Sequence, residues 1–174
     1  GKDRKSISNY STLIKEGDDF AYKIGSSDIP AEWKNVEYDD TQWTTGASGF
    51  GYGDNDDATI VPENTLSVFV RKTFEITNID NLTELLLHID YDDGFVAYLN
   101  GQEIARANLG TPNTEVAYNQ TADTYIEPVM INGQAPILFT IDNFKDIVIE
   151  GTNALCIQVH NQSTTSSDIS LIPF

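Results

Sequence analysis

Three aspartates, Asp54, Asp56 and Asp57, follow a glycine-rich stretch at residues 46–53. Carboxylates this close together repel one another unless a cation or solvent screens them. Calcium is the natural partner because it is a hard ion that takes roughly six to eight oxygen ligands from carboxylates, carbonyls and water. The spacing is not that of an EF-hand, whose sixth position would be Thr59 instead of glycine. The three residues are a candidate calcium site, and a solvated acidic loop is the alternative.

A second pair of carboxylates, Asp92 and Asp93, directly precedes Gly94. Asp-Gly is a common dipeptide in tight turns, since both residues tolerate positive φ better than most. Turn geometry therefore explains Asp93 without any ligand. A direct role for both aspartates in binding a sugar is the second interpretation.

Neutral polar residues at His160 and Asn161 leave the end of a predicted strand and enter a Ser/Thr-rich loop at 162–168. Such groups suit sugar hydroxyls, which need paired donors and acceptors, and an aromatic ring such as Trp33 or Tyr52 can stack on a pyranose. The alternative is that these polar residues satisfy their own backbone. We expect Trp43 to lie in the core.

Catalytic chemistry has little support in the sequence. The two histidines, His88 and His160, lie on separate predicted strands, and no motif links either to a nucleophile. A pair of acids for glycoside hydrolysis needs a defined separation, which a sequence does not show. We therefore expect no enzymatic activity. Arg71, alone among acidic residues, is expected to pair with a carboxylate, and Cys156 to be a buried side chain in a strand.

The elements that must position these residues centre on the stretch 84–107, which contains the turn dipeptides Asp93-Gly94 and Asn100-Gly101. Two such turns predict three consecutive antiparallel strands, at about 84–92, 95–99 and 102–107. The middle strand is short, so the three must belong to a larger sheet.

The rest of the chain supplies further short strands and turn signals. Alternation of apolar and polar residues predicts a strand with one buried face at 155–160. Eight to ten strands with little helix favour an all-β fold, an antiparallel β-sandwich or jelly roll. We expect a flexible N-terminal segment at 1–10 and a single β-sandwich domain at 11–174. The other expected elements are strands near 11–15, 20–24, 68–76 and 169–174, and an extended run near 125–131. We also expect a long loop at 26–53 pinned by two tryptophans, one helical turn at 39–43, and a short helix at 142–148.

The charge of the chain limits its partners. Ten basic against 27 acidic residues give a formal net charge of -17. This field repels nucleic acid and anionic membranes and attracts cations. The sequence also contains no apolar run of the length that crosses a bilayer, so we expect no membrane insertion.

Several stretches together resemble the galactose-binding-domain-like β-sandwich modules of secreted multidomain bacterial proteins. They follow the family's order and cover roughly residues 20–174. The matching stretches are Tyr38–Trp43, Gly49–Asp57, Phe69–Phe74, Asp92–Gly101, Glu150–Asn161 and Ser166–Asp168.

This resemblance implies a jelly roll that often holds a structural calcium and, in many relatives, binds carbohydrate through loops at one edge. We therefore expect a non-catalytic, calcium-stabilised carbohydrate-binding module of a secreted or cell-surface protein, tethered to other domains of a larger chain, with a polysaccharide or glycan as partner. A structural or protein-docking module with the same fold is the alternative.

Overall fold

The computed structural model describes residues 10–53 and 57–174. The predicted flexible segment 1–10 lies almost wholly outside these ranges, and so do two of the three predicted calcium ligands, Asp54 and Asp56.

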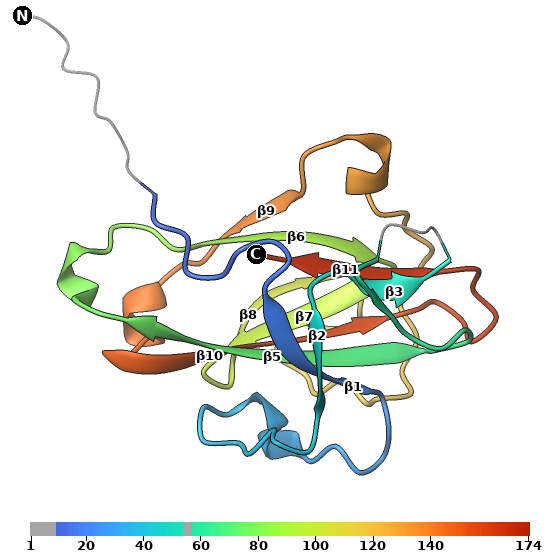
Figure 1. Cartoon of the computed structure of the whole chain (residues 1–174), viewed down its shortest axis with the longest axis horizontal. Helices are drawn as coiled ribbons and strands as arrows, with labels where there is room; N and C mark the ends of the chain where they lie inside the picture. Colours follow the sequence, from blue (N-terminus) through green and yellow to red (C-terminus); the bar gives the residue numbers. More distant parts are fainter. Residues whose placement is uncertain (1–9, 54–56) are drawn as a thin grey trace, which may run out of the picture.

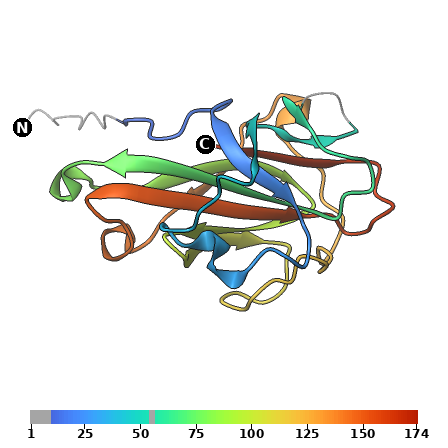
Figure 2. The ribbon, with the colours of Figure 1, turned by 60° about the horizontal axis from the view of Figure 1, so that its bottom comes forward.

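Two sheets stacked on each other form the body of the molecule (Figure 1, Figure 2). The six-stranded sheet has the order β2 (Thr44–Ala47), β1 (Asp19–Ile24), β5 (Ser67–Ile76), β10 (Gly151–His160), β7 (Gly94–Leu99), β8 (Gln102–Ala107). The five-stranded sheet has the order β4 (Thr59–Ile60), β3 (Phe50–Tyr52), β11 (Ile169–Pro173), β6 (Leu86–Asp92), β9 (Ile137–Thr140).

Neighbouring strands are antiparallel, except that β3 and β4 run parallel. In the described ranges the helical segments are four 3₁₀ turns: η1 (Ala31–Lys34), η2 (Ile79–Asn81), η3 (Met130–Asn132) and η4 (Phe144–Asp146). The predicted all-β sandwich with little helix is confirmed. No helix of the described residues has the length and apolarity needed to cross a membrane.

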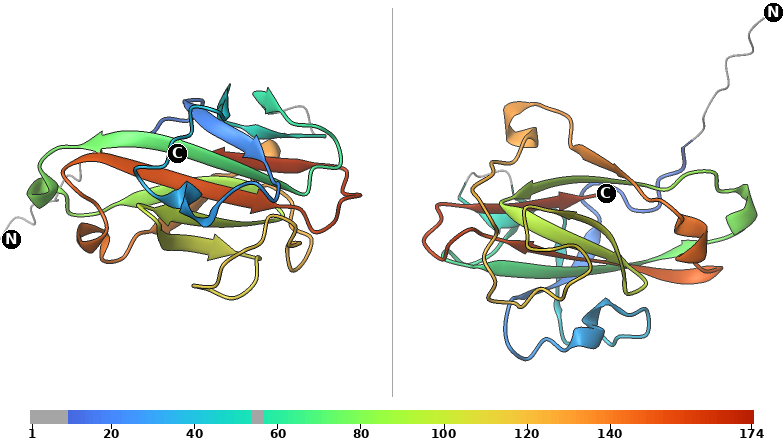
Figure 3. Two further views of the ribbon diagram at one scale, coloured as in Figure 1. Left: turned by 90° about the horizontal axis from the view of Figure 1, so that it is seen from below. Right: turned by 180° about the vertical axis from the view of Figure 1, so that it is seen from behind.

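Strand β10 is buried on both faces, although its alternation predicts one buried face. Leu155 and Ile157 point into the main core between the sheets, whereas Ala154 and Cys156 belong to a second apolar cluster on the outer face of the six-stranded sheet. The η1 loop and the loop after β8 cover that outer face (Figure 3, left). Small side chains on this face of β10 therefore meet loop residues instead of water.

The two tryptophans anchor the covering loop as expected. Trp33 and Trp43 stack with ring centroids 6.2 Å apart, and the rings of Trp33 and Phe69 meet edge to face with centroids 4.9 Å apart. Arg71 lies beneath this loop and is 1% exposed. Its Nε lies 2.9 Å from Oδ2 of Asp40, which confirms the predicted pairing with a carboxylate.

The connection between β6 and β7 differs from the predicted hairpin. Strand β6 pairs with β11 and β9, whereas β7 pairs with β10 and β8, so the chain passes from one sheet to the other between Asp92 and Gly94. The turn predicted at Asp93-Gly94 is therefore wrong. Neither residue has the positive φ that a two-residue hairpin turn requires. Gly94 is instead required by close packing, because a Cβ there would lie 2.4 Å from the carbonyl oxygen of Asn108.

The second predicted turn is correct. Asn100 and Gly101 have φ values of 51° and 83°, and they join β7 to β8 in an antiparallel hairpin. Positive φ at both central residues matches the twist of the flanking strands.

Other local predictions are less accurate. Residues 11–15 do not form the predicted strand, and residues 39–43 do not form the predicted helical turn. The helix predicted at 142–148 is only the turn η4. Strand β9 lies in a range for which the sequence predicts no strand. The extended run predicted near 125–131 joins neither sheet, for a visible reason. Its backbone N–H groups at Ile126, Val129 and Met130 donate to the carboxylates of Asp93 and Asp90 instead of a neighbouring strand.

Candidate functional site

Strand register brings most of the predicted site residues to one end of the sandwich. Tyr52 on β3 is opposite Ile169, Asp92 on β6 is opposite Ser170, and His160 on β10 is opposite Gly94. Asp93 and Asn161 adjoin these positions, so five of the six predicted sugar-binding residues gather there. The sixth, Trp33, lies apart, under the η1 loop on the outer face of the six-stranded sheet.

All six of these side chains are buried. Trp33 and Tyr52 are each 4% exposed, and the other four are 0% exposed: Asp92, Asp93, His160 and Asn161. A side chain without exposed area has no face on which a polysaccharide can lie. Direct sugar contact by these residues stays a prediction that their burial disfavours.

Asp93 has a structural explanation. Its Oδ1 accepts the Ile126 N–H at 2.6 Å and its Oδ2 accepts the Gln162 N–H at 2.7 Å. The carboxylate therefore ties two loops, one after β8 and one after β10, to the crossing between the sheets. Asn161 acts similarly, since its amide donates to the Thr65 carbonyl at 3.0 Å.

His160 is held as a neutral imidazole. Its Nδ1 lies 2.7 Å from the Gln120 carbonyl oxygen, so Nδ1 carries the proton and donates it. Burial lowers the pKa of His160 to about 4, with the Gln120 carbonyl acting weakly in the opposite direction. The Nε2 atom is buried and has no hydrogen-bond partner among the described residues.

Asp92 is the least satisfied of the buried groups. Both of its carboxylate oxygens are buried, and apart from a hydrogen bond that a protonated Asp92 can share with Asp93, neither has a partner in the described part of the chain. Burial raises the pKa of Asp92 to about 9, and the negative charges of Asp93, Asp168 and Glu127 act in the same direction. The arrangement therefore accommodates Asp92 either as a neutral acid or beside a cation.

Asp57 is the one predicted calcium ligand within the described residues. Its carboxylate lies over Gly51, where a Cβ would come within 2.5 Å of both oxygens. In the described ranges no group of three or more His, Cys, Asp or Glu side chains is close enough together to hold a metal ion. A site that uses fewer carboxylates must take its remaining oxygens from hydroxyls, main-chain carbonyls and water.

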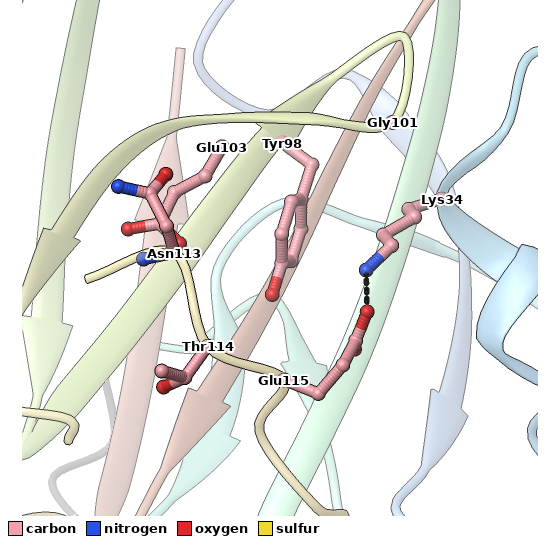
Figure 4. A pocket seen from close by; sticks show the side chains of 7 residues that line it. All are labelled: Lys34, Tyr98, Gly101, Glu103, Asn113, Thr114 and Glu115. Carbon is pink, nitrogen blue, oxygen red and sulfur yellow. Dashed lines mark hydrogen bonds and ion pairs between the residues drawn. The ribbon is translucent and has the colours of Figure 1, made fainter. Parts of the chain in front are cut away.

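A small polar hollow of about 200 Å³ opens beside the β7–β8 hairpin (Figure 4). The Lys34 amine lies 4.6 Å from the centre of the Tyr98 ring and 2.5 Å from the Glu115 carboxylate. Glu103 is bound by the Arg106 guanidinium at 2.7 and 3.0 Å. The charged groups of this hollow are thus already paired with one another.

A larger hollow of about 530 Å³ lies beside β1 and β2. The partly exposed ring of Tyr22 contributes apolar surface, Trp43 lines the hollow but is buried, and Gln42 and Thr44 are exposed polar residues at its rim. Trp43 is buried as the sequence predicts, and sequence reasoning misses this place because it treats Tyr22 only as part of a predicted strand. The available signal is three consecutive residues, 42–44, that combine an aromatic ring with hydrogen-bonding side chains.

Solved structures share this fold, although no protein-family model and no curated relative matches the chain. A β-glucuronidase from Bifidobacterium dentium, complexed with coumarin-3-O-glucuronide, aligns with a TM-score of 0.53 at 14% identity, over 85% of this chain and 20% of that one. A glycosyl hydrolase family 2 member from Bacteroides cellulosilyticus aligns with a TM-score of 0.53 at 12% identity, over 93% and 20%. Bacteroides uniformis β-glucuronidase 2 aligns with a TM-score of 0.52 at 13% identity, over 93% of this chain and 17% of that one.

The chain thus spans about a fifth of the length of these glycosidases. At such low identity the likeness shows a common fold. It agrees with the β-sandwich part of the expected resemblance, and no match places the chain among galactose-binding-like modules in particular.

Proposed function

We propose that the chain is a non-catalytic, calcium-stabilised carbohydrate-binding domain of a larger secreted or cell-surface protein. Its fold recurs as about a fifth of several enzymes named for acting on β-glucuronides, which supports both a carbohydrate context and a larger parent chain. Fold alone does not determine function, so the binding role depends on a site.

The observation that carries the proposal is the hollow beside β1 and β2. Its volume of about 530 Å³ falls within the usual range of small-ligand sites, roughly 300–1,000 Å³. The partly exposed ring of Tyr22 can stack on the apolar face of a sugar ring, and Gln42 offers an amide donor and an acceptor to hydroxyls. Because β2 is an edge strand of its sheet, a long polysaccharide can pass this hollow without meeting a neighbouring strand.

Charge favours neutral glycans for this role. The net charge of -17 repels polyanions, so we expect polysaccharides without carboxylates to bind more tightly than those rich in uronic acid. Near the hollow, Lys23 offers little compensation because its amine lies 2.7 Å from the Asp28 carboxylate.

Affinity gel electrophoresis on neutral plant and algal polysaccharides, with a uronate-rich pectin beside them, tests the proposal. A neutral polysaccharide is expected to retard the protein. Replacing Gln42 by alanine should weaken retardation by about 0.5–1.5 kcal/mol, roughly two- to tenfold in dissociation constant, which is the net value of one hydrogen bond.

The matched control is Gln134→Ala, an exposed glutamine near η3 on the five-stranded sheet's side of the chain, which should bind like the unaltered protein. If both variants were retarded equally, the glycan would bind at a place other than this hollow. No retardation on any gel would favour a protein-docking module, and release of sugars from the same panel would contradict the non-catalytic assignment.

A further inference from the structure

A row of three residues crosses the outer face of the five-stranded sheet. Gly51 on β3 is opposite Ser170 on β11, and Ser170 is opposite Asp92 on β6. Directly opposed residues in antiparallel strands point to the same face. Their neighbours Phe50, Ile169 and Leu171 point into the main core, so the row points outward.

The Asp57 carboxylate completes this row. It lies over Gly51, in the space that a side chain would otherwise occupy. Two carboxylates, from Asp57 and Asp92, therefore lie on either side of the Ser170 hydroxyl on one face of the sheet. The row therefore brings Asp57, one of the predicted calcium ligands, near an aspartate for which the sequence suggests sugar binding.

Burial and missing partners distinguish this place from an ordinary acidic patch. Asp92 and Ser170 are each 0% exposed, and within the described residues the Ser170 hydroxyl makes no hydrogen bond and the Asp92 carboxyl has only the one that, when protonated, it can share with Asp93. A neutral Asp92 can share its proton with the Asp93 carboxylate, but this leaves the buried Ser170 hydroxyl without a partner. Asp93 is already engaged, because main-chain N–H groups donate to both of its oxygens.

The surrounding charge has one sign. The charges that act most strongly on Asp92 come from Asp93, Asp168 and Glu127, all acidic. Segment 126–130 closes over this face, since its N–H groups are held by Asp93 and Asp90. A cation bound beneath the segment would supply both the missing positive charge and the missing partners for buried oxygens.

We propose that Asp92 and Ser170, together with the Asp57 carboxylate, bind a calcium ion on the outer face of the five-stranded sheet. Calcium fits this set because it accepts irregular combinations of carboxylate, hydroxyl, carbonyl and water oxygens. The inference deepens the calcium part of the proposed function and does not depend on glycan binding.

Titration calorimetry with calcium chloride on the EDTA-treated 174-residue chain tests the inference directly. The unaltered protein should bind calcium, and its Tm should rise by about 5–10 °C at a calcium concentration about 100 times Kd, because the ion binds only the folded state. Asp92→Asn keeps the shape of the side chain and removes its charge, and it should abolish both the binding heat and the Tm rise.

Two further variants keep the test decisive. Ser170→Ala should fold and lose at least about tenfold in calcium affinity, so it serves if the Asp92 variant does not fold. Asp142→Asn is the matched control, since Asp142 is exposed and follows β9 at the opposite end of the sandwich. It should bind calcium as the unaltered protein does.

Absence of calcium binding by the unaltered protein would overturn the inference. So would equal calcium binding by the Asp92 and Ser170 variants, which would place any calcium elsewhere in the chain. Glycan retardation is measured separately on the same proteins, so failure of the sugar site and failure of the calcium site are distinguished.

Discussion

Single residues in this chain reveal how burial changes a prediction. Asp92, Asp93, His160 and Asn161 are candidate site residues because polar groups cluster beside turn signals, and the structure does bring them together. Their burial does not follow from the sequence. The segment that covers Asp93 comes from residues 122–130, more than 25 positions along the chain, and no local pattern indicates that it folds back.

The buried histidine gives the first prediction at this scale. The folded-state pKa of His160 is about 4, below the usual value of about 6.5 for an unfolded chain. Below pH 6.5 His160 binds a proton in the unfolded chain but stays neutral in the folded protein. The folded protein therefore loses stability as pH falls from about 6.5 to about 4. The full effect is of the order of 3 kcal/mol.

Urea unfolding of the unaltered protein and of His160→Gln, at several pH values between about 7 and about 4.5, measures this effect. Glutamine keeps a side-chain amide that can donate a hydrogen bond, and it does not titrate. The stability difference between the two proteins should shift in favour of the glutamine variant as pH falls. Since other titrating groups act in both proteins, parallel curves would show that folding does not change the pKa of His160.

Secondary-structure elements are predicted best where the signal is local. The Asn100-Gly101 hairpin and the ranges of β5, β7, β8 and β11 follow from turn dipeptides and alternation. Which sheet a strand joins is not a local property. Strands β6 and β7 are adjacent in the chain and belong to different sheets, because their partners β11 and β10 come from the C-terminal part of the sequence.

The crossing between β6 and β7 gives the prediction at the scale of elements. Replacing Gly94 by alanine places a methyl group 2.4 Å from the Asn108 carbonyl oxygen, and backbone cannot move aside as a flexible side chain can. Such overpacking typically costs about 1–3 kcal/mol, and we expect the upper end of that range.

Gly17→Ala is the comparison for this experiment. Gly17 has a φ of 81°, and no atom lies within 4 Å of the place that an added methyl group would take, so its replacement tests conformational strain alone. That strain is worth about 1 kcal/mol. Urea denaturation of both variants should show the larger loss of stability for Gly94. A smaller loss at Gly94 would mean that the crossing can widen to admit a side chain.

At the scale of the whole molecule, the composition indicates which classes of partner are disfavoured, but it does not indicate where a ligand would bind. The net charge of -17 predicts mutual repulsion across the folded surface. The sequence therefore predicts weak binding to polyanions. The hollow beside Tyr22 and Trp43, by contrast, can be recognised only from the arrangement of β1, β2 and the η1 loop.

Salt should consequently stabilise the calcium-free protein. Raising sodium chloride from about 10 to about 150 mM shortens the screening length from about 30 Å to about 8 Å, which weakens long-range repulsion between carboxylates. In EDTA the Tm measured by scanning calorimetry should rise over this interval. A constant Tm would indicate that the acidic residues are spaced widely enough not to interact.

The chain passes from one sheet to the other at Asp92–Gly94, and this crossing also affects how the protein unfolds. The β6 strand cannot detach from the five-stranded sheet without pulling on β7, which is hydrogen-bonded along β10 in the middle of the other sheet. Opening at this corner is thereby coupled to the loss of both layers, and the two sheets should unfold as one cooperative unit.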